Sequence, residues 1–203
     1  MRRAFCAFAL VLALVACTGG DKSNNPTDNG AAAAKSFAEA TCVDLASWAH
    51  AVQPAFADLQ AATALDPTNK NAAQASLHKL SAELATADQA TGTLADGINS
   101  RAEPAIASGG ELKKTLVDTL GQLRTFVQQL KSEIDAFDFT TATPEQSTKL
   151  STDLRNLTNT IAEPLSSLFT LFSSNPSITS AFENSASCKQ TGSELFGSGS
   201  GSG

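Results

Sequence analysis

The feature that most constrains the fold is a stripe of large apolar residues through positions 109–138. These residues are spaced three or four positions apart. Because an α-helix has 3.6 residues per turn, this spacing places all of them on one helix face. The stripe consists of Leu112, Leu116, Leu120, Leu123, Val127, Leu130, Ile134 and Phe137.

Three further segments carry a stripe of the same kind. They are residues 32–64 (Leu45, Trp48, Val52, Phe56, Leu59), residues 67–107 (Leu77, Leu80, Leu84, Ala87, Thr91, Leu94, Ile98) and residues 144–173 (Leu150, Leu154, Leu157, Ile161, Leu165, Leu168, Phe172). Each stripe is removed from water only if another helix covers it, so four stripes favour mutual packing. We therefore expect an all-α fold, an antiparallel four-helix bundle with knobs-into-holes contacts.

Polar residues followed by proline mark the expected helix starts. The three pairs are Asp66-Pro67, Thr143-Pro144 and Asn175-Pro176. Each pair places an N-cap residue before a proline at the first helical position. Residues 108–111 and 143–146 also have the spacing of a capping box. The third pair begins a short fifth helix over about 176–189, and the short connections favour antiparallel neighbours.

Three prolines, Pro54, Pro104 and Pro164, fall inside the predicted helices. An interior proline removes one backbone hydrogen bond and bends the helix. Bends at Pro54 and Pro164 either open a cleft in the bundle or merely wrap the helices around the core. A group of late phenylalanines likewise either lines an apolar pocket for a lipid-like ligand or plugs one end of the bundle. The group consists of Phe126, Phe137, Phe139, Phe169, Phe172 and Phe182.

The N-terminus has the pattern of an export signal, with Arg2 and Arg3 before an apolar run that ends at Ala16. The run is shorter than the roughly 20 residues that a membrane-spanning helix needs. Its end, LVAC at residues 14–17, resembles the lipobox of bacterial lipoproteins. The resemblance implies that Cys17 receives a diacylglyceryl group, that the peptide bond before it is cut, and that the new amine is acylated.

The same resemblance implies an exported protein held at a membrane, because two or three acyl chains make a lasting anchor. After Cys17, residues up to position 30 are small or polar, so we expect residues 17–30 to form a flexible tether. Residue 18 is threonine and not the aspartate that retains some lipoproteins in an inner membrane. The expected location is therefore the outer membrane of a two-membrane host, or the outer leaflet of the cell membrane of a one-membrane host.

The four cysteines divide by location. Cys6 leaves with the signal and Cys17 carries the lipid, so Cys42 and Cys188 remain. Outside the cytoplasm such a pair is usually oxidised, which predicts a disulfide between the first helix and the C-terminal segment. In the chain-entropy model, closing this loop of about 147 residues contributes roughly 5 kcal/mol. A redox-active or metal-binding pair is the alternative, although the spacing fits no compact metal motif.

Charge and motif patterns narrow the function classes. Without residues 1–16 the chain keeps 12 of its 14 Lys and Arg against 20 Asp and Glu, a net charge of −8. Such an acidic surface repels nucleic acid and anionic lipid head groups. His50 and His78 lie off the apolar stripes, and no zinc, haem or di-iron motif occurs. Ser76 and Lys79 match the serine-acylase pattern S-x-x-K, but its companion motifs are absent, so we interpret the match as chance.

We therefore expect a signal peptide (1–16), the lipidated tether (17–30), a helical bundle domain (31–190) and a flexible Gly/Ser tail (191–203), either native or an added linker. The expected function is a non-catalytic binding or scaffold module of the cell envelope. It would be tethered to the membrane, use no metal or cofactor, and have an envelope protein as its partner. The alternative is a carrier or sensor that binds a hydrophobic small molecule or lipid within the bundle. The sequence identifies neither the ligand nor the oligomeric state.

Overall fold

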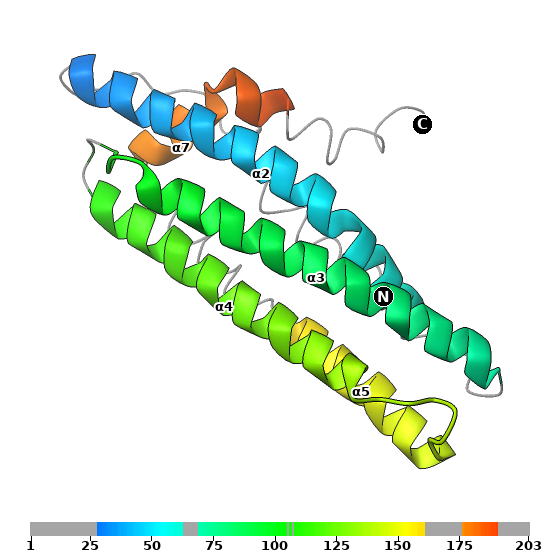
Figure 1. Ribbon diagram of the computed structural model, residues 1–203. Helices are drawn as coiled ribbons and strands as arrows, with labels where there is room; N and C mark the ends of the chain where they lie inside the picture. The colour runs from blue at the N-terminus through cyan, green and yellow to red at the C-terminus, as the bar shows by residue number, and fades with distance from the viewer. Residues whose placement is uncertain (1–27, 63–68, 105, 107, 161–175, 191–203) are drawn as a thin grey trace, which may run out of the picture. The chain divides into compact units, whose positions relative to one another are not determined.

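The computed structural model describes residues 28–62, 69–104, 106, 108–160 and 176–190 (Figure 1). Every regular element within these residues is an α-helix, which confirms the predicted all-α class for this part of the chain. The elements are α2 (Asp28–Ala62), α3 (Lys70–Ser100), α4 (Gly109–Asp135), α5 (Pro144–Thr160) and α7 (Pro176–Glu183).

The chain packs as two compact units, and α2, α3 and α4 each contribute to both. Unit 1 contains the described residues within 1–47, 94–119 and 162–203, and unit 2 those within 48–93 and 120–161. The signal and tail predicted at the two ends lie outside the described residues, as do Cys17 and Pro164. Of the tether predicted over 17–30, residues 28–30 are described, and they form the start of α2 and not a flexible linker.

In unit 2, contacts between side chains show that α2 and α3 run antiparallel. Trp48 of α2 bonds to Thr91 of α3 at 3.0 Å. Ten residues further along α2, Asp58 pairs with Lys79, which lies earlier in α3. Because the partners move backwards along α3 as the chain advances along α2, the two helices have opposite directions here.

The same reasoning applies to α3 and α4 in unit 2. Asp88 accepts hydrogen bonds from Arg124 and Gln128, each at 2.9 Å. Ser81, two turns earlier in α3, donates to Asp135 at the end of α4 at 2.5 Å. The partners again move in opposite directions along the two helices, so this pair is also antiparallel.

The predicted apolar stripes are largely confirmed as buried. All seven stripe residues of α3 are buried, as are the stripe residues of α4 from Leu112 to Ile134. Phe137 lies beyond the end of α4 and is half-buried. In α2, Trp48, Val52 and Leu59 are buried, while Leu45 and Phe56 are half-buried. In α5, Leu150 and Leu154 are buried; the later stripe positions, from Leu157 to Phe172, lie outside the described side chains.

The start of α3 differs from the prediction. The helix begins at Lys70 and not at Pro67, and Asn69 supplies its N-cap. The side-chain oxygen of Asn69 accepts the Ala72 N–H at 3.3 Å, and its carbonyl accepts the Ala73 N–H at 3.0 Å. Asparagine is among the residues preferred at the N-cap position, so Asn69 can cap a helix that begins at the next residue.

The prediction that Pro104 lies inside a helix is wrong. α3 ends at Ser100, where the Arg101 N–H closes a tighter turn onto the Ile98 carbonyl at 3.2 Å. Pro104 is buried in the connection to α4, and its carbonyl accepts the Ile106 N–H at 2.8 Å. Proline disfavours helix at the residue before it, which explains why α3 stops short. Pro54, by contrast, lies inside α2 as predicted.

Of the two predicted capping boxes, the one that begins α5 is confirmed. Thr143 Oγ1 accepts the Gln146 N–H at 3.3 Å, and Gln146 Oε1 accepts the Thr143 N–H at 2.8 Å. The other box begins at Ser108, whose φ of 62° is left-handed. An N-cap residue normally has extended backbone, so Ser108 precedes α4 without the expected capping geometry.

The predicted fifth helix is interrupted. α7 begins at Pro176 as expected but ends at Glu183, and a second helical stretch covers 186–190. Ser185 separates the two and accepts the Cys188 N–H on its hydroxyl at 3.3 Å, which is the geometry of an N-cap. A serine in the middle of the segment therefore starts a new helical turn instead of continuing α7.

Candidate functional site

An apolar cavity in unit 2 is the candidate site that the described residues offer. It lies among α2, α3 and α4 and is lined by Trp48, Val52, Ala55, Phe56, Leu59, Leu84, Ala87, Thr91, Leu123, Phe126, Val127 and Leu130. Its volume is about 20 Å³, which is enough space for about one water molecule. Pockets for lipid-like or drug-sized ligands are usually several hundred Å³. The cavity is thus much smaller than such a ligand.

The one polar feature of the cavity wall is a buried hydrogen-bond chain. The indole N–H of Trp48 donates to Thr91 Oγ1 at 3.0 Å. The same hydroxyl donates to the Ala87 carbonyl at 2.7 Å. Since a hydroxyl both accepts and donates, Thr91 provides a hydrogen-bond acceptor for the Trp48 indole N–H and finds an acceptor for its own O–H, although both groups lie in an apolar wall.

We expect Thr91→Val to lower the free energy of unfolding by about 1–2 kcal/mol, because valine keeps the shape but leaves the buried indole N–H without this acceptor. The measurement is urea denaturation followed by circular dichroism. In a Trp48→Phe background the indole is absent, so Thr91→Val should cost much less. An equal cost in both backgrounds would contradict the assigned role of the Trp48–Thr91 bond.

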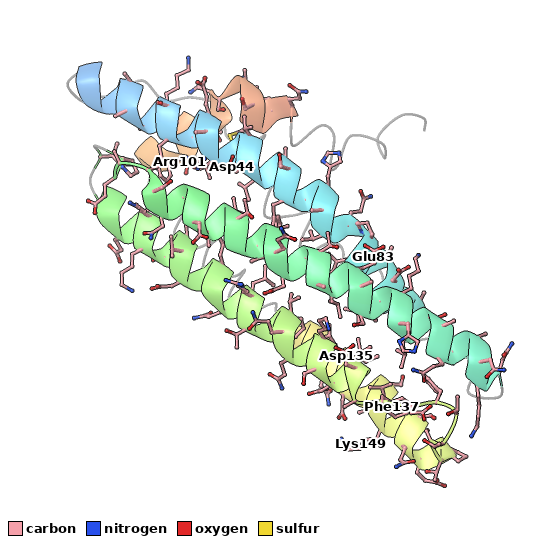
Figure 2. All side chains as sticks on the ribbon, viewed as in Figure 1. Asp44, Glu83, Arg101, Asp135, Phe137 and Lys149 are labelled. Carbon is pink, nitrogen blue, oxygen red and sulfur yellow. A yellow bond between two sulfur atoms is a disulfide. The ribbon has the colours of Figure 1, made fainter. Side chains whose placement is uncertain are left out.

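A second polar group in unit 2 surrounds the carboxylate of Asp135, labelled in Figure 2. Lys131 donates a charged hydrogen bond to this carboxylate, and Ser81, on α3, donates another at 2.5 Å. These two donors, with a smaller contribution from the charge of His78, hold the pKa of Asp135 below its ordinary value of 3.8. The carboxylate therefore favours its charged form and links α3 to α4.

The lowered pKa has a defined sign for stability. A folded-state pKa below the unfolded value means that the carboxylate stabilises the fold above about pH 4 and stops doing so as the pH falls through the folded value. Because the Asp135 side chain is 45% exposed, solvent screening limits the effect to a few tenths of a kcal/mol. The measurement is the free energy of unfolding between about pH 6 and about pH 2, the range in which carboxyl groups titrate. As the pH falls, this free energy should decrease more steeply in the wild type than in Asp135→Asn. Parallel pH curves for the two proteins would contradict the assigned role of Asp135.

The two histidines and the Ser76–Lys79 pair all belong to unit 2. His50 and His78 are both exposed, and His78 Nε2 lies 3.2 Å from Gln74 Nε2. Lys79 is bound to both carboxylate oxygens of Asp58, at 3.1 and 3.0 Å. The ammonium group of Lys79 is thus engaged by a carboxylate of α2.

The described members of the late phenylalanine group belong to two different units. Phe126 lines the cavity of unit 2. Phe137 and Phe139 pack edge to face just after α4, with ring centroids 4.9 Å apart. Phe182 belongs to unit 1, and the other two members lie outside the described residues. The pocket predicted for this group is therefore lined by only one of its described members.

In unit 1, Cys42 of α2 and Cys188 of the C-terminal segment form the disulfide that the sequence analysis predicts. Their Cα atoms are 4.9 Å apart, within the usual range for a disulfide. The Cys42 residue is 1% exposed, whereas Cys188 is half-buried. The bond thus joins a buried helix position to a partly accessible one.

Sequence reasoning missed a polar group beside this disulfide in unit 1. The Arg101 guanidinium pairs with Asp44, as Figure 2 shows, and donates to Thr41 Oγ1 at 3.3 Å. Lys113 Nζ donates to the Arg101 carbonyl at 2.6 Å. These side chains come from α2, the connection after α3, and α4. No periodic pattern could have identified them, because each lies off its apolar stripe.

Two further features concern metal binding and membrane crossing. No group of three or more His, Cys, Asp or Glu side chains in the described ranges is placed to hold a metal ion. No helix in those ranges is both long and apolar enough to cross a membrane. Comparison of the whole chain with protein-family models, with curated proteins and with solved structures finds no match.

Proposed function

We propose that the chain is an exported lipoprotein whose helical domain acts as a non-catalytic binding or scaffold module of the cell envelope. The observation that carries the proposal is LVAC at residues 14–17, behind two arginines and a short apolar run. The Cys42–Cys188 disulfide supports it, because disulfides persist in oxidising compartments outside the cytoplasm. The acyl groups on Cys17 would hold the domain at a membrane surface.

The finer architecture that we propose is an antiparallel four-helix bundle with a short C-terminal helix. The antiparallel pairs α2–α3 and α3–α4 in unit 2 support it. The buried Leu150 and Leu154 of α5 supply the apolar face that a fourth helix needs. Such a bundle presents long polar helix faces, which suit a protein that binds other proteins through its surface.

A scaffold is favoured over a carrier of hydrophobic molecules by the size of the cavity in unit 2. At about 20 Å³ it is far below the volume of an acyl chain or a similar ligand. Among the described residues, many charged side chains form ion pairs within or between neighbouring helices, for example Arg124–Asp88 and Lys149–Asp153. These pairs present a charged helical surface.

The anchor is tested by Cys17→Ser, with Cys6→Ser as the matched control because it removes a thiol from the same leader but outside the motif. We expect Cys17→Ser to abolish acyl labelling and to leave the leader uncut, as shown by metabolic labelling with a fatty acid and by intact mass. Cys6→Ser should be labelled and cut like the wild type. Normal labelling of the Cys17 variant would overturn the lipoprotein proposal.

The scaffold is tested against the carrier by native mass spectrometry of the protein purified without detergent. A scaffold predicts the mass of the unliganded protein. A co-purifying lipid that survives buffer exchange, and that is lost when Phe56→Trp narrows the cavity mouth, would instead identify a carrier. Residues Val52 and Phe56 line the cavity from α2, so the substitution acts at the site itself.

A further inference from the structure

The C-terminal segment of unit 1, residues 176–190, is joined to α2 by a covalent bond. Cys188 of this segment forms the disulfide with Cys42. Figure 1 shows α7, the first part of the segment, against the N-terminal half of α2. Between positions 179 and 190, only Phe182 and Ser185 are buried, while the other side chains are half-buried or exposed.

Non-covalent contacts alone hold such a segment weakly. Ordering a dozen residues costs conformational entropy at each position, and one buried phenylalanine offsets only a small part of that cost. The helical hydrogen bonds contribute little more, because α7 has 8 residues and isolated helices of that length are marginal in water. The disulfide is therefore the covalent link that holds the segment on α2, beside its weaker side-chain contacts.

The two cysteine residues differ in exposure. Cys42 lies on the buried face of α2 and is 1% exposed, whereas Cys188 is half-buried in the middle of the helical stretch 186–190. Thiol–disulfide exchange requires a thiolate to reach one of the two sulfurs, and access decides which one it attacks. A reductant in solution therefore meets Cys188 first.

We propose that residues 176–190 form a strap that is released from α2 when a dithiol reductant attacks the disulfide at Cys188. The attacking thiolate forms a mixed disulfide with Cys188 Sγ, and the electron pair of the broken S–S bond leaves on Cys42, which takes up a proton. The second thiol of the reductant then breaks the mixed disulfide. The products are two cysteine thiols in the protein and one disulfide in the reductant.

Release of the strap removes Cys188 from the face of α2 on which Cys42 lies. On this face Ala38 lies one turn and Ala34 two turns before Cys42, and all three are at most 5% exposed in the oxidised protein. Cys188 Sγ lies 3.7 Å from the Ala38 carbonyl, so reduction would free this part of α2 from its contact with the strap. This switch does not depend on the lipid anchor, so it can be tested in purified protein whether or not Cys17 is acylated.

Hydrogen exchange followed by mass spectrometry tests the release. In brief labelling of the purified full chain, reduction with dithiothreitol should speed amide exchange in 176–190 by about tenfold or more, while α3 remains largely unexchanged in both states. Unchanged exchange in 176–190 would overturn the proposal. Exchange in α3 as fast as in 176–190 would also overturn it, because the whole fold would then have opened and not only the strap. Reoxidation of the same sample should restore the slow exchange.

The site of attack is tested by trapping. A dithiol oxidoreductase whose resolving cysteine is replaced by serine should accumulate as a mixed disulfide on Cys188, with about tenfold less on Cys42, as read by peptide mapping. Trapping mainly on Cys42, or no trapping unless the chain is first unfolded, would refute attack at Cys188. The Cys42→Ser/Cys188→Ser variant should trap nothing, and its residues 176–190 should exchange fast without any reductant.

Discussion

Replacement of both Cys42 and Cys188 by alanine is expected to lower the free energy of unfolding by about 2–5 kcal/mol. The bond closes a loop with a sequence separation of 146, so its removal restores a large amount of conformational freedom to the unfolded chain. The folded state also loses the link that docks residues 176–190 on α2. The length of this loop makes the double substitution the largest change that we expect from any pair of substitutions in the described residues.

The measurement is urea denaturation of the oxidised wild type and of the double variant under non-reducing conditions. Val43→Ala is the matched control, because Val43 adjoins Cys42 on α2 but is 53% exposed. Substitutions at exposed positions usually change the free energy of unfolding by less than about 0.5 kcal/mol. A loss of under about 1 kcal/mol in the double variant would show that the bond contributes little to the fold.

Gly109→Ala is expected to destabilise unit 1 by about 3 kcal/mol, the upper part of the range for overpacking. A Cβ at this position would lie 2.0 Å from the carbonyl oxygen of Pro104. That oxygen belongs to the backbone and already accepts the Ile106 N–H, so it cannot swing aside as a side chain would. The whole connection between α3 and α4 would have to move.

Gly121→Ala is the matched control for this prediction. Gly121 also lies in α4, but a Cβ there would meet no atom within 4 Å. Alanine is a better helix former than glycine, so this substitution should raise the free energy of unfolding by about 1 kcal/mol. Chemical denaturation of both variants should thus show shifts of opposite sign. An increase in the free energy of unfolding in both variants would mean that Pro104 and Gly109 do not approach as closely as described.

The helical part of the fold could be predicted from the sequence where apolar spacing was regular. Every stripe residue from Leu77 to Ile98 is buried, because one face of a long helix must be covered whichever partner covers it. The capping box at Thr143 was also predictable, since it depends on residues three positions apart. The prediction failed at Pro104 because the end of α3 depends on how the chain turns into α4.

The contacts of the candidate sites were less predictable. The Cys42–Cys188 pairing followed from counting cysteines in a chain that we propose to be exported. By contrast, the bond between Trp48 and Thr91 joins two members of different stripes, and spacing within each helix says nothing about their mutual position. The pair Arg101 and Asp44 involves residues off the stripes, where the sequence carries no signal of burial.

The sequence by itself determined most of the segments that become helices and the faces that they bury. These properties depend on residues within a few turns of one another, and the backbone geometry of one helix relates them. Only the tertiary structure decided that Thr91 accepts the Trp48 indole, that Pro104 excludes a side chain at Gly109, and that Cys188 is more accessible than Cys42. Each of these depends on atoms far apart in the chain, whose approach is set by how the helices end and pack.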